Sequence, residues 1–139
     1  MAPTDVYYIR TPNAPLPVVG TMSQAVAVGD KVFVSGVLGF TPGSLVLISD
    51  DLREQTVQTF QNVIAILEAA GSSSKNVVQA TIFLTDINDL EIVDDIYNQM
   101  FGPRVGAKTY LQSTNTYTGS KIHMETVAIT GNVEIKYVE

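Results

Sequence analysis

Residues 52–70 carry the pattern that most restricts the fold, because their apolar side chains recur at the spacing of an α-helix. The members of this stripe are Val57, Phe60, Val63, Ile64, Leu67 and Ala70. Asp50 or Asp51 is available as an N-terminal cap, and Gly71 follows as a residue that ends helices. An amphipathic helix must bury its apolar stripe, so the rest of the chain has to supply a layer on which it packs.

That layer is predicted to be a β-sheet, because runs of alternating or β-branched residues stand on both sides of the helix. The predicted strands are residues 5–10, 23–28, 31–37, 76–85, 107–114, 121–130 and 133–138, with a short one at 45–47. Gly29 and Asp30 are typical of a tight hairpin turn, and Gly131 and Asn132 indicate a turn back into the last strand.

A second helix is predicted after the strand at 76–85, with Asn88 as its cap and Gly102 and Pro103 after its end. Its apolar face consists of Leu90, Val93, Ile96, Tyr97 and Met100. The order of elements predicts one α/β (α+β) domain over residues 1–139, in which two helices pack on one face of a mixed sheet.

Charge and composition limit the partners of the chain. Charged residues make up 16% of the sequence, against about 25% in typical soluble domains, so part of the surface is expected to be buried against other copies. The net charge of −6 disfavours nucleic acid and anionic membranes. The chain shows neither a leader pattern nor an apolar run long enough to span a bilayer, which predicts a cytoplasmic protein without a membrane partner.

The absence of cysteine and the presence of one histidine, His123, limit the possible metal sites. Thiolate sites are excluded, and one chain cannot build a site from several histidines. We expect no cofactor and no metal.

Glu125 is the leading candidate for chemistry, because it lies inside an apolar strand where an unpaired carboxylate is unfavourable. The other interpretation is that Glu125 points to solvent on a half-exposed strand. Lys108 is either a solvated strand end or an anchor for a small acidic ligand. His123 shares a face with Glu125 under strict alternation and is either a hydrogen-bonded surface residue or a base. Asp94 is interpreted, from periodicity, as part of the solvated face of the second helix.

Four groups of residues also carry a resemblance to a known family. They are Ser23-Gln24-Ala25-Val26 with Val34-Ser35-Gly36, Gln61-Asn62-Val63 with Glu68-Ala69-Ala70-Gly71, the run TIFLTDIND at 81–89, and Met124-Glu125 with Ala128. In this order and spacing, the chain resembles the RidA/YjgF family of imine and enamine deaminases over nearly its whole length. The resemblance implies a RidA/chorismate-mutase-like fold, a homotrimer, and ligand sites in the clefts between subunits.

The resemblance also implies roles for particular residues. Catalytically competent members use an arginine to grip the substrate carboxylate and a glutamate near the C-terminus to position the attacking water. Glu125 matches that glutamate, and counting back without a gap places the arginine position at Lys108. Lysine keeps the positive charge but lacks the planar fork that holds a carboxylate in fixed geometry. Arg104, four positions earlier, is a second candidate for the anchor.

Other positions of the implied substrate site match only in part. Ser35 and Gly36 match the family pattern. Met22 stands where such members carry a tyrosine, Asp94 where some carry asparagine, and Tyr110 where a cysteine or small residue is common. We therefore expect substrate-binding roles for these five positions, with a specificity that differs from that of the parent reaction.

Two classes of function remain after this reasoning. The first is a hydrolytic deaminase of small imine or enamine substrates, with an acidic group expected on the substrate, or a divergent member acting on a different, biosynthetic intermediate through acid/base chemistry of Glu125. In the divergent case Lys108 would shuttle protons or act as a Schiff-base nucleophile. The alternative is a non-catalytic trimeric ligand-binding or regulatory protein. An RNA-cleaving role is disfavoured by the acidic charge.

Overall fold

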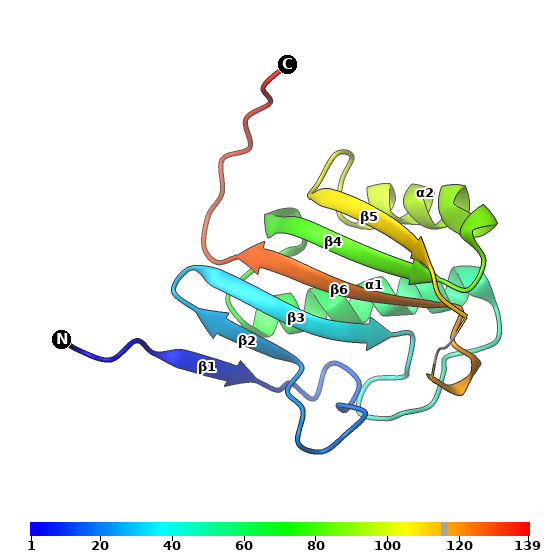
Figure 1. Cartoon of the computed structure of the whole chain (residues 1–139), viewed down its shortest axis with the longest axis horizontal. Helices are drawn as coiled ribbons and strands as arrows, with labels where there is room; N and C mark the ends of the chain where they lie inside the picture. The colour runs from blue at the N-terminus through cyan, green and yellow to red at the C-terminus, as the bar shows by residue number, and fades with distance from the viewer. Residues whose placement is uncertain (115–116) are drawn as a thin grey trace.

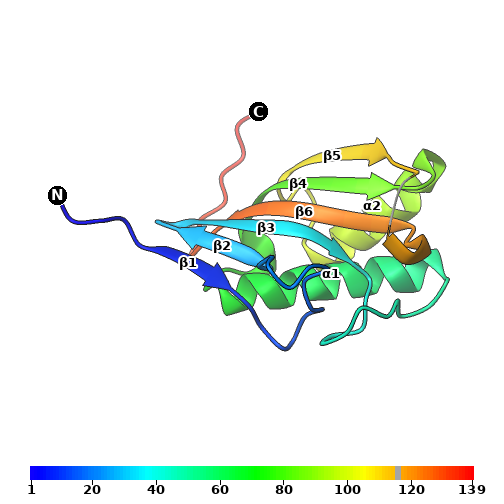
Figure 2. The same ribbon diagram turned by 60° about the horizontal axis from the view of Figure 1, so that its bottom comes forward.

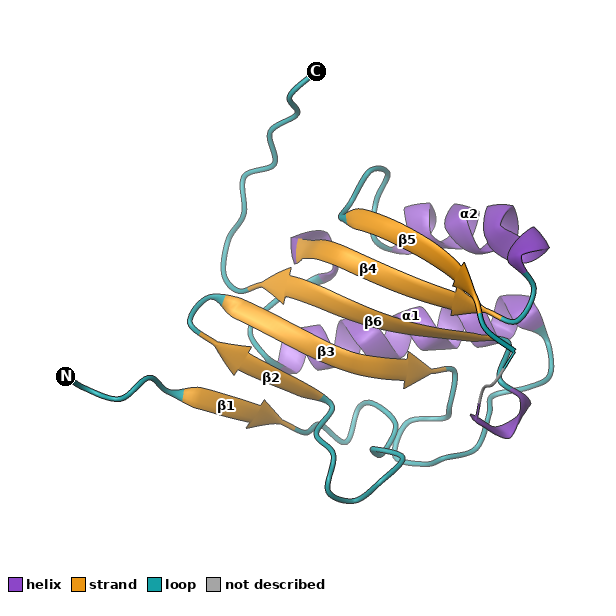
Figure 3. Cartoon of the chain, viewed as in Figure 1, coloured by secondary structure: helices purple, strands orange, loops and turns teal. Residues whose placement is uncertain are grey.

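The structure is a computed structural model that describes residues 1–114 and 117–139. Within these residues it contains six β-strands and two α-helices, which Figure 3 distinguishes by colour. The strands are β1 (Val6–Ile9), β2 (Ala25–Val28), β3 (Lys31–Leu38), β4 (Val77–Leu84), β5 (Ala107–Gln112) and β6 (Ile122–Ile129). The helices are α1 (Leu52–Ala69) and α2 (Leu90–Met100), and short 3₁₀ segments are η1 (Ser74–Asn76), η2 (Ile87–Asp89) and η3 (Tyr117–Gly119).

The strands form one mixed sheet in the order β1-β2-β3-β6-β4-β5 (Figure 1). β4 and β5 run parallel, whereas the other neighbouring strands are antiparallel. β6 follows all other strands in the sequence, yet it lies between β3 and β4. The predicted mixed sheet is confirmed, and the residues of β6 lie at its middle.

Both helices cover the same face of the sheet, as Figure 2 shows, which confirms the predicted two layers. α1 packs on β3 and β6 and also against α2. In the core, the ring of Phe60 meets the rings of Tyr97 and Phe101 edge to face, with centroids 5.6 and 5.3 Å apart. Within the described residues no helix lies on the opposite face, where Phe33 and Leu111 are exposed. We call this uncovered side the open face.

The N-terminal cap of α1 is one of the two predicted residues, whereas the N-terminal cap predicted for α2 is not observed. Asp51 caps α1, because its Oδ2 accepts a hydrogen bond of 2.9 Å from the Glu54 N–H. The prediction that Asn88 caps α2 is wrong, since Asn88 lies in η2 and donates its own N–H to Asp86. Asp89 precedes α2 without a side-chain cap.

Neither helix in the described part of the chain is long and apolar enough to cross a membrane.

Two of the predicted strands are wrong. Residues 133–138 alternate like a strand, but the structure gives them no strand pairing. Both edges of β6 are already paired, one with β3 and one with β4, so a segment turning back from β6 finds no free edge beside it. The predicted strand at 45–47 is reduced to a single bridge between Phe40 and Leu47.

The alternation along β4 is interrupted near its start. Val77 is buried and Val78 is exposed, the reverse of strict alternation from the buried Ala80, because the register against β6 shifts between Val77 and Gln79. A bulge of this kind moves the following residues to the other face. From Ala80 onward the residues alternate regularly, with Ile82 and Leu84 buried toward the helices.

Candidate functional site

The structure places Glu125 and Lys108 on opposite faces of the sheet. Glu125 pairs with Thr81 of β4, whereas Lys108 pairs with the neighbouring residue, Ala80. Since successive residues of a strand point to opposite faces and Ala80 is buried under the helices, Lys108 lies on the helix side and Glu125 on the open face. One copy of the chain therefore does not bring the two predicted catalytic residues together.

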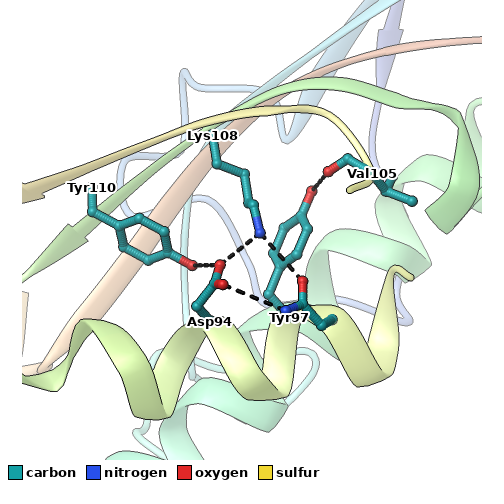
Figure 4. Close-up of polar contacts among 6 residues, drawn as sticks. Asp94, Tyr97, Val105, Lys108 and Tyr110 are labelled. Carbon is teal, nitrogen blue, oxygen red and sulfur yellow. Dashed lines mark hydrogen bonds and ion pairs between the residues drawn. The ribbon is translucent and has the colours of Figure 1, made fainter. Parts of the chain in front are cut away.

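Lys108 lies in a polar cluster between β5 and α2 (Figure 4). Its Nζ donates to Asp94 Oδ1 at 2.6 Å and to Asn98 Oδ1 at 3.3 Å. The Tyr110 hydroxyl donates to the same Asp94 oxygen at 2.8 Å, and Asn98 Nδ2 donates to Asp94 Oδ2 at 3.4 Å. Asp94 and Asn98 stand one turn apart on α2, while Lys108 and Tyr110 alternate on β5, so both pairs face each other. The prediction of Asp94 as a merely solvated residue is wrong.

The buried ring of Tyr97 contacts the ammonium group of Lys108. The Lys108 Nζ lies 4.5 Å from the centre of the Tyr97 ring, within the range of a cation–π contact. The Tyr97 hydroxyl donates to the Val105 carbonyl at 2.8 Å, which fixes the ring (Figure 4). Gly106 has a φ of +77°, and a Cβ there would lie 3.0 Å from Val77 and 3.3 Å from the Tyr97 hydroxyl. Glycine is required at this position for β5 to approach α2 so closely.

The charges of this cluster balance internally. Burial is the largest influence on Asp94 and raises its pKa, but the hydrogen bonds from Lys108 and Tyr110 and the lysine charge outweigh burial and hold the pKa below its usual 3.8. Burial, and then the hydrogen bond to Asp94, raise the pKa of Tyr110 well above its usual range. At neutral pH Asp94 is therefore a carboxylate and Tyr110 a neutral hydrogen-bond donor.

Arg104 lies in a different environment. It adopts a φ of +63°, its Nη1 lies 2.9 Å from Glu139 Oε1, and its guanidinium carbon lies 4.7 Å from the centre of the Tyr137 ring. Its ion pair and its ring contact are both made with the C-terminal segment, and its side chain is 62% exposed. In this structure Arg104 therefore binds the C-terminal segment rather than the Lys108 cluster.

Met22, Ser35 and Gly36 line one pocket together with residues 15–18 and Ile66 of α1. Ser35 and Gly36 lie where the register of β3 against β6 shifts, between Val34 and Val37. The Ser35 hydroxyl donates to the Gln24 carbonyl at 3.1 Å. Within one chain the pocket and the Lys108 cluster are lined by different residues.

Glu125 stands on the open face at a shallow hollow between β3, β6 and β4. The hollow is lined by Phe33, Val34, Gln79, Thr81, Glu125, Thr126 and Val127. Glu125 is exposed, so the expectation of a carboxylate buried in an apolar strand is not met within one chain. No three His, Cys, Asp or Glu side chains gather into a metal-binding group among the residues that the structure describes.

His123 lies on the open face two residues from Glu125, as alternation predicts, but sequence reasoning did not assign it to the site. Its ring stacks on Phe83 with centroids 4.4 Å apart, and its Cδ2 lies 3.9 Å from where a Cβ on Gly36 would stand. Burial lowers the His123 pKa below 6.5, and the negative charge of Glu125 opposes that shift only in part. A neutral imidazole at pH 7 can accept a proton, so His123 is a second candidate base.

The lowered pKa of His123 predicts that acid destabilises the protein. Because the unfolded chain binds a proton near pH 6.5 and the folded chain binds it only at lower pH, the stabilising contribution is present above 6.5 and is lost as pH falls below it. We expect the free energy of unfolding in urea to fall between pH 7 and pH 5, and to fall less in His123→Gln. Equal falls in both proteins would contradict the assignment, since His123 is the only histidine.

Comparison with known proteins places the chain in a family. A family model described as Endoribonuclease L-PSP matches residues 11–135. The 2-iminobutanoate/2-iminopropanoate deaminase of Homo sapiens is 40% identical over 123 residues, which cover 88% of this chain and 89% of that protein. The crystal structure of RidA from Psychrobacter has a TM-score of 0.82 at 33% identity, covering 88% of this chain and 98% of that one. The Escherichia coli protein TdcF with bound serine has a TM-score of 0.82 at 28% identity, covering 90% and 99%. The chain belongs to the RidA/YjgF family.

Proposed function

We propose that this protein hydrolyses reactive imines and enamines to carbonyl compounds and ammonia. An enamine first takes up a proton at carbon and gives up one from nitrogen, and so becomes the imine. The oxygen of water then bonds to the imine carbon, and the two protons that water gives up pass to the nitrogen. The carbon–nitrogen bond breaks as the carbonyl forms, and ammonia leaves. Such a reaction needs one group that orients or deprotonates water and a site that holds the substrate.

The observation that carries the proposal is the pair of proton-exchanging side chains on the open face, in a chain 40% identical to a human imine deaminase. Glu125 is exposed at the hollow, where its carboxylate can position a water, and His123 stands two residues along the same face of β6. The lining residue Thr81 supplies a further hydroxyl next to Glu125, with which it pairs across the strands.

The site is proposed to be completed by a neighbouring copy in a homotrimer. Phe33 and Leu111 on the open face are 44% and 46% exposed, and an exposed apolar face combined with few charged residues favours burial against another copy. Because Lys108 and Glu125 lie on opposite faces of one sheet, they can serve one substrate only if different copies supply them.

A non-catalytic ligand-binding or regulatory trimer is the second candidate. The observation in its favour is the closed ion pair of Lys108 and Asp94, which occupies the cation expected to hold a substrate carboxylate. This candidate keeps the pocket at Met22, Ser35 and Gly36 but assigns no bond-breaking step to Glu125.

The test is ammonia release from freshly generated imines, combined with the mass of the protein in solution. An amino-acid oxidase supplies 2-imino acids in situ, and a flavin amine oxidase supplies imines that carry no carboxylate. We expect the wild type to accelerate ammonia release from at least one of these classes and to have the mass of three chains. Binding without acceleration of either class would favour the regulatory candidate, and a monomeric mass would rule out a shared cleft.

A further inference from the structure

The cations of this chain are already engaged or fully exposed, and this limits what the site can bind. Lys31 and Arg104 form surface ion pairs, Arg10 donates to the carbonyls of Gly20 and Met22, and Lys121 donates to the Asp50 carbonyl. The remaining cations except Lys108 are exposed; they are Arg53, Lys75 and Lys136. Lys121 and Lys108 are the two half-buried cations among the described residues, and Lys108 is the one that the family resemblance places at a substrate carboxylate.

The ammonium group of Lys108 donates two hydrogen bonds and lies over an aromatic ring. A lysine ammonium has three N–H groups. Asp94 Oδ1 at 2.6 Å, Asn98 Oδ1 at 3.3 Å and the Tyr97 ring at 4.5 Å surround the Nζ (Figure 4). The Lys108 side chain is only 17% exposed, which leaves little room for another group. An incoming carboxylate would have to displace one of these partners.

Displacement of Asp94 by a free carboxylate is unfavourable for two reasons. Asp94 is held on α2 beside Lys108, so its carboxylate is present at high effective concentration without loss of translational freedom. The incoming carboxylate would also place a second negative charge next to Asp94, which already accepts hydrogen bonds from Lys108 and Tyr110. The net charge of −6 further slows the approach of anions.

We propose that Asp94 takes the place of a substrate carboxylate at Lys108, so that the protein acts on imines and enamines that carry no acidic group. This inference rests on the proposed hydrolytic function and names its substrate class. It departs from the expectation of an acidic substrate that follows from the family resemblance. Substrates without a carboxylate are preferred because Asp94 already pairs with Lys108 and repels a second anion.

Calorimetric titration with pyruvate and with its uncharged amide, pyruvamide, tests the inference directly. We expect wild type to bind pyruvamide at least as tightly as pyruvate. In Asp94→Asn the lysine loses its internal partner, and pyruvate affinity is expected to rise at least about tenfold, the low end for a charge-assisted hydrogen bond. Asp95→Asn is the matched control, because Asp95 is exposed on the next position of α2 and its replacement changes the net charge equally.

The outcomes separate this inference from the proposed function. The inference would be overturned if wild type bound pyruvate more tightly than pyruvamide. It would also be overturned if Asp94→Asn gained no more pyruvate affinity than Asp95→Asn. The wild-type comparison needs no variant, so it decides even if Asp94→Asn does not fold. In the ammonia assay, we expect uncharged imines to be consumed at least about tenfold faster than 2-imino acids. A preference for 2-imino acids overturns the inference alone, whereas no acceleration of any imine overturns the proposed function.

Discussion

Glu125→Gln is expected to lower kcat for imine hydrolysis by about 10²- to 10⁴-fold, the range for loss of a positioned general acid or base. The carboxamide keeps the shape of the side chain but is a far weaker proton acceptor, so water at the hollow loses its activating partner. Since Glu125 is exposed on β6, the substitution should leave the free energy of unfolding within about 0.5 kcal/mol of wild type. Steady-state ammonia release and urea unfolding of the same preparation measure both quantities.

Glu68→Gln is the control, because Glu68 is exposed near the end of α1 and its replacement makes the same chemical change away from the open face. Its kcat should equal that of wild type. His123→Gln, compared in the same assay, shows which of the two side chains activates the water. If Glu125→Gln keeps full activity while His123→Gln loses it, the role passes from Glu125 to His123.

Phe60→Ala is expected to reduce the free energy of unfolding by about 3–5 kcal/mol, as for other fully buried aromatic residues. Phe60 is fully buried, and its ring joins α1 to α2 through edge contacts with Tyr97 and Phe101. The cavity would open beneath Tyr97, so the contact with Lys108 should weaken as well. Urea unfolding followed by circular dichroism measures the loss, at one protein concentration, because assembly would make stability depend on concentration.

Tyr8→Ala provides the comparison, since the Tyr8 side chain on β1 is 72% exposed. An equally large aromatic truncation there should change the free energy of unfolding by about 0.5 kcal/mol or less. Similar losses in the two variants would show that burial in the core of one chain does not decide the stability.

The sequence predicted those elements that local physics determines. The stripe from Val57 to Ala70, the capping aspartate and Gly71 act within a few residues of one another, and α1 has the expected bounds to within one residue. The segment 133–138 has an equally regular pattern but no partner edge, because β3 and β4 flank β6. Pattern shows that a segment can form a strand, whereas pairing depends on topology.

In the candidate site, too, local patterns predicted some features, whereas others depend on topology. Alternation correctly placed His123 and Glu125 on one face. Of the seven substrate-binding positions implied by the resemblance, Met22, Ser35 and Gly36 line one pocket. The separation of Lys108 from Glu125 follows from their pairing with adjacent residues of β4, which no local pattern reveals.

The contacts around Lys108 are also nonlocal. Asp94 and Tyr97 come from α2, which meets β5 only after the Gly106 turn allows close approach. The helical pattern placed Tyr97 on the buried face, but only the packed structure shows that a lysine lies over its ring.

The central position of β6 has a consequence for how the chain folds during synthesis. β1, β2 and β3 can pair with one another early, and β4 and β5 can form a second parallel unit, but only β6 joins the two. Until residues 122–129 have left the ribosome, β3 and β4 each present an unpaired edge that invites pairing with other chains. The growing polypeptide is therefore most prone to aggregation just before its sheet is completed, when chaperones that shield strand edges would help most.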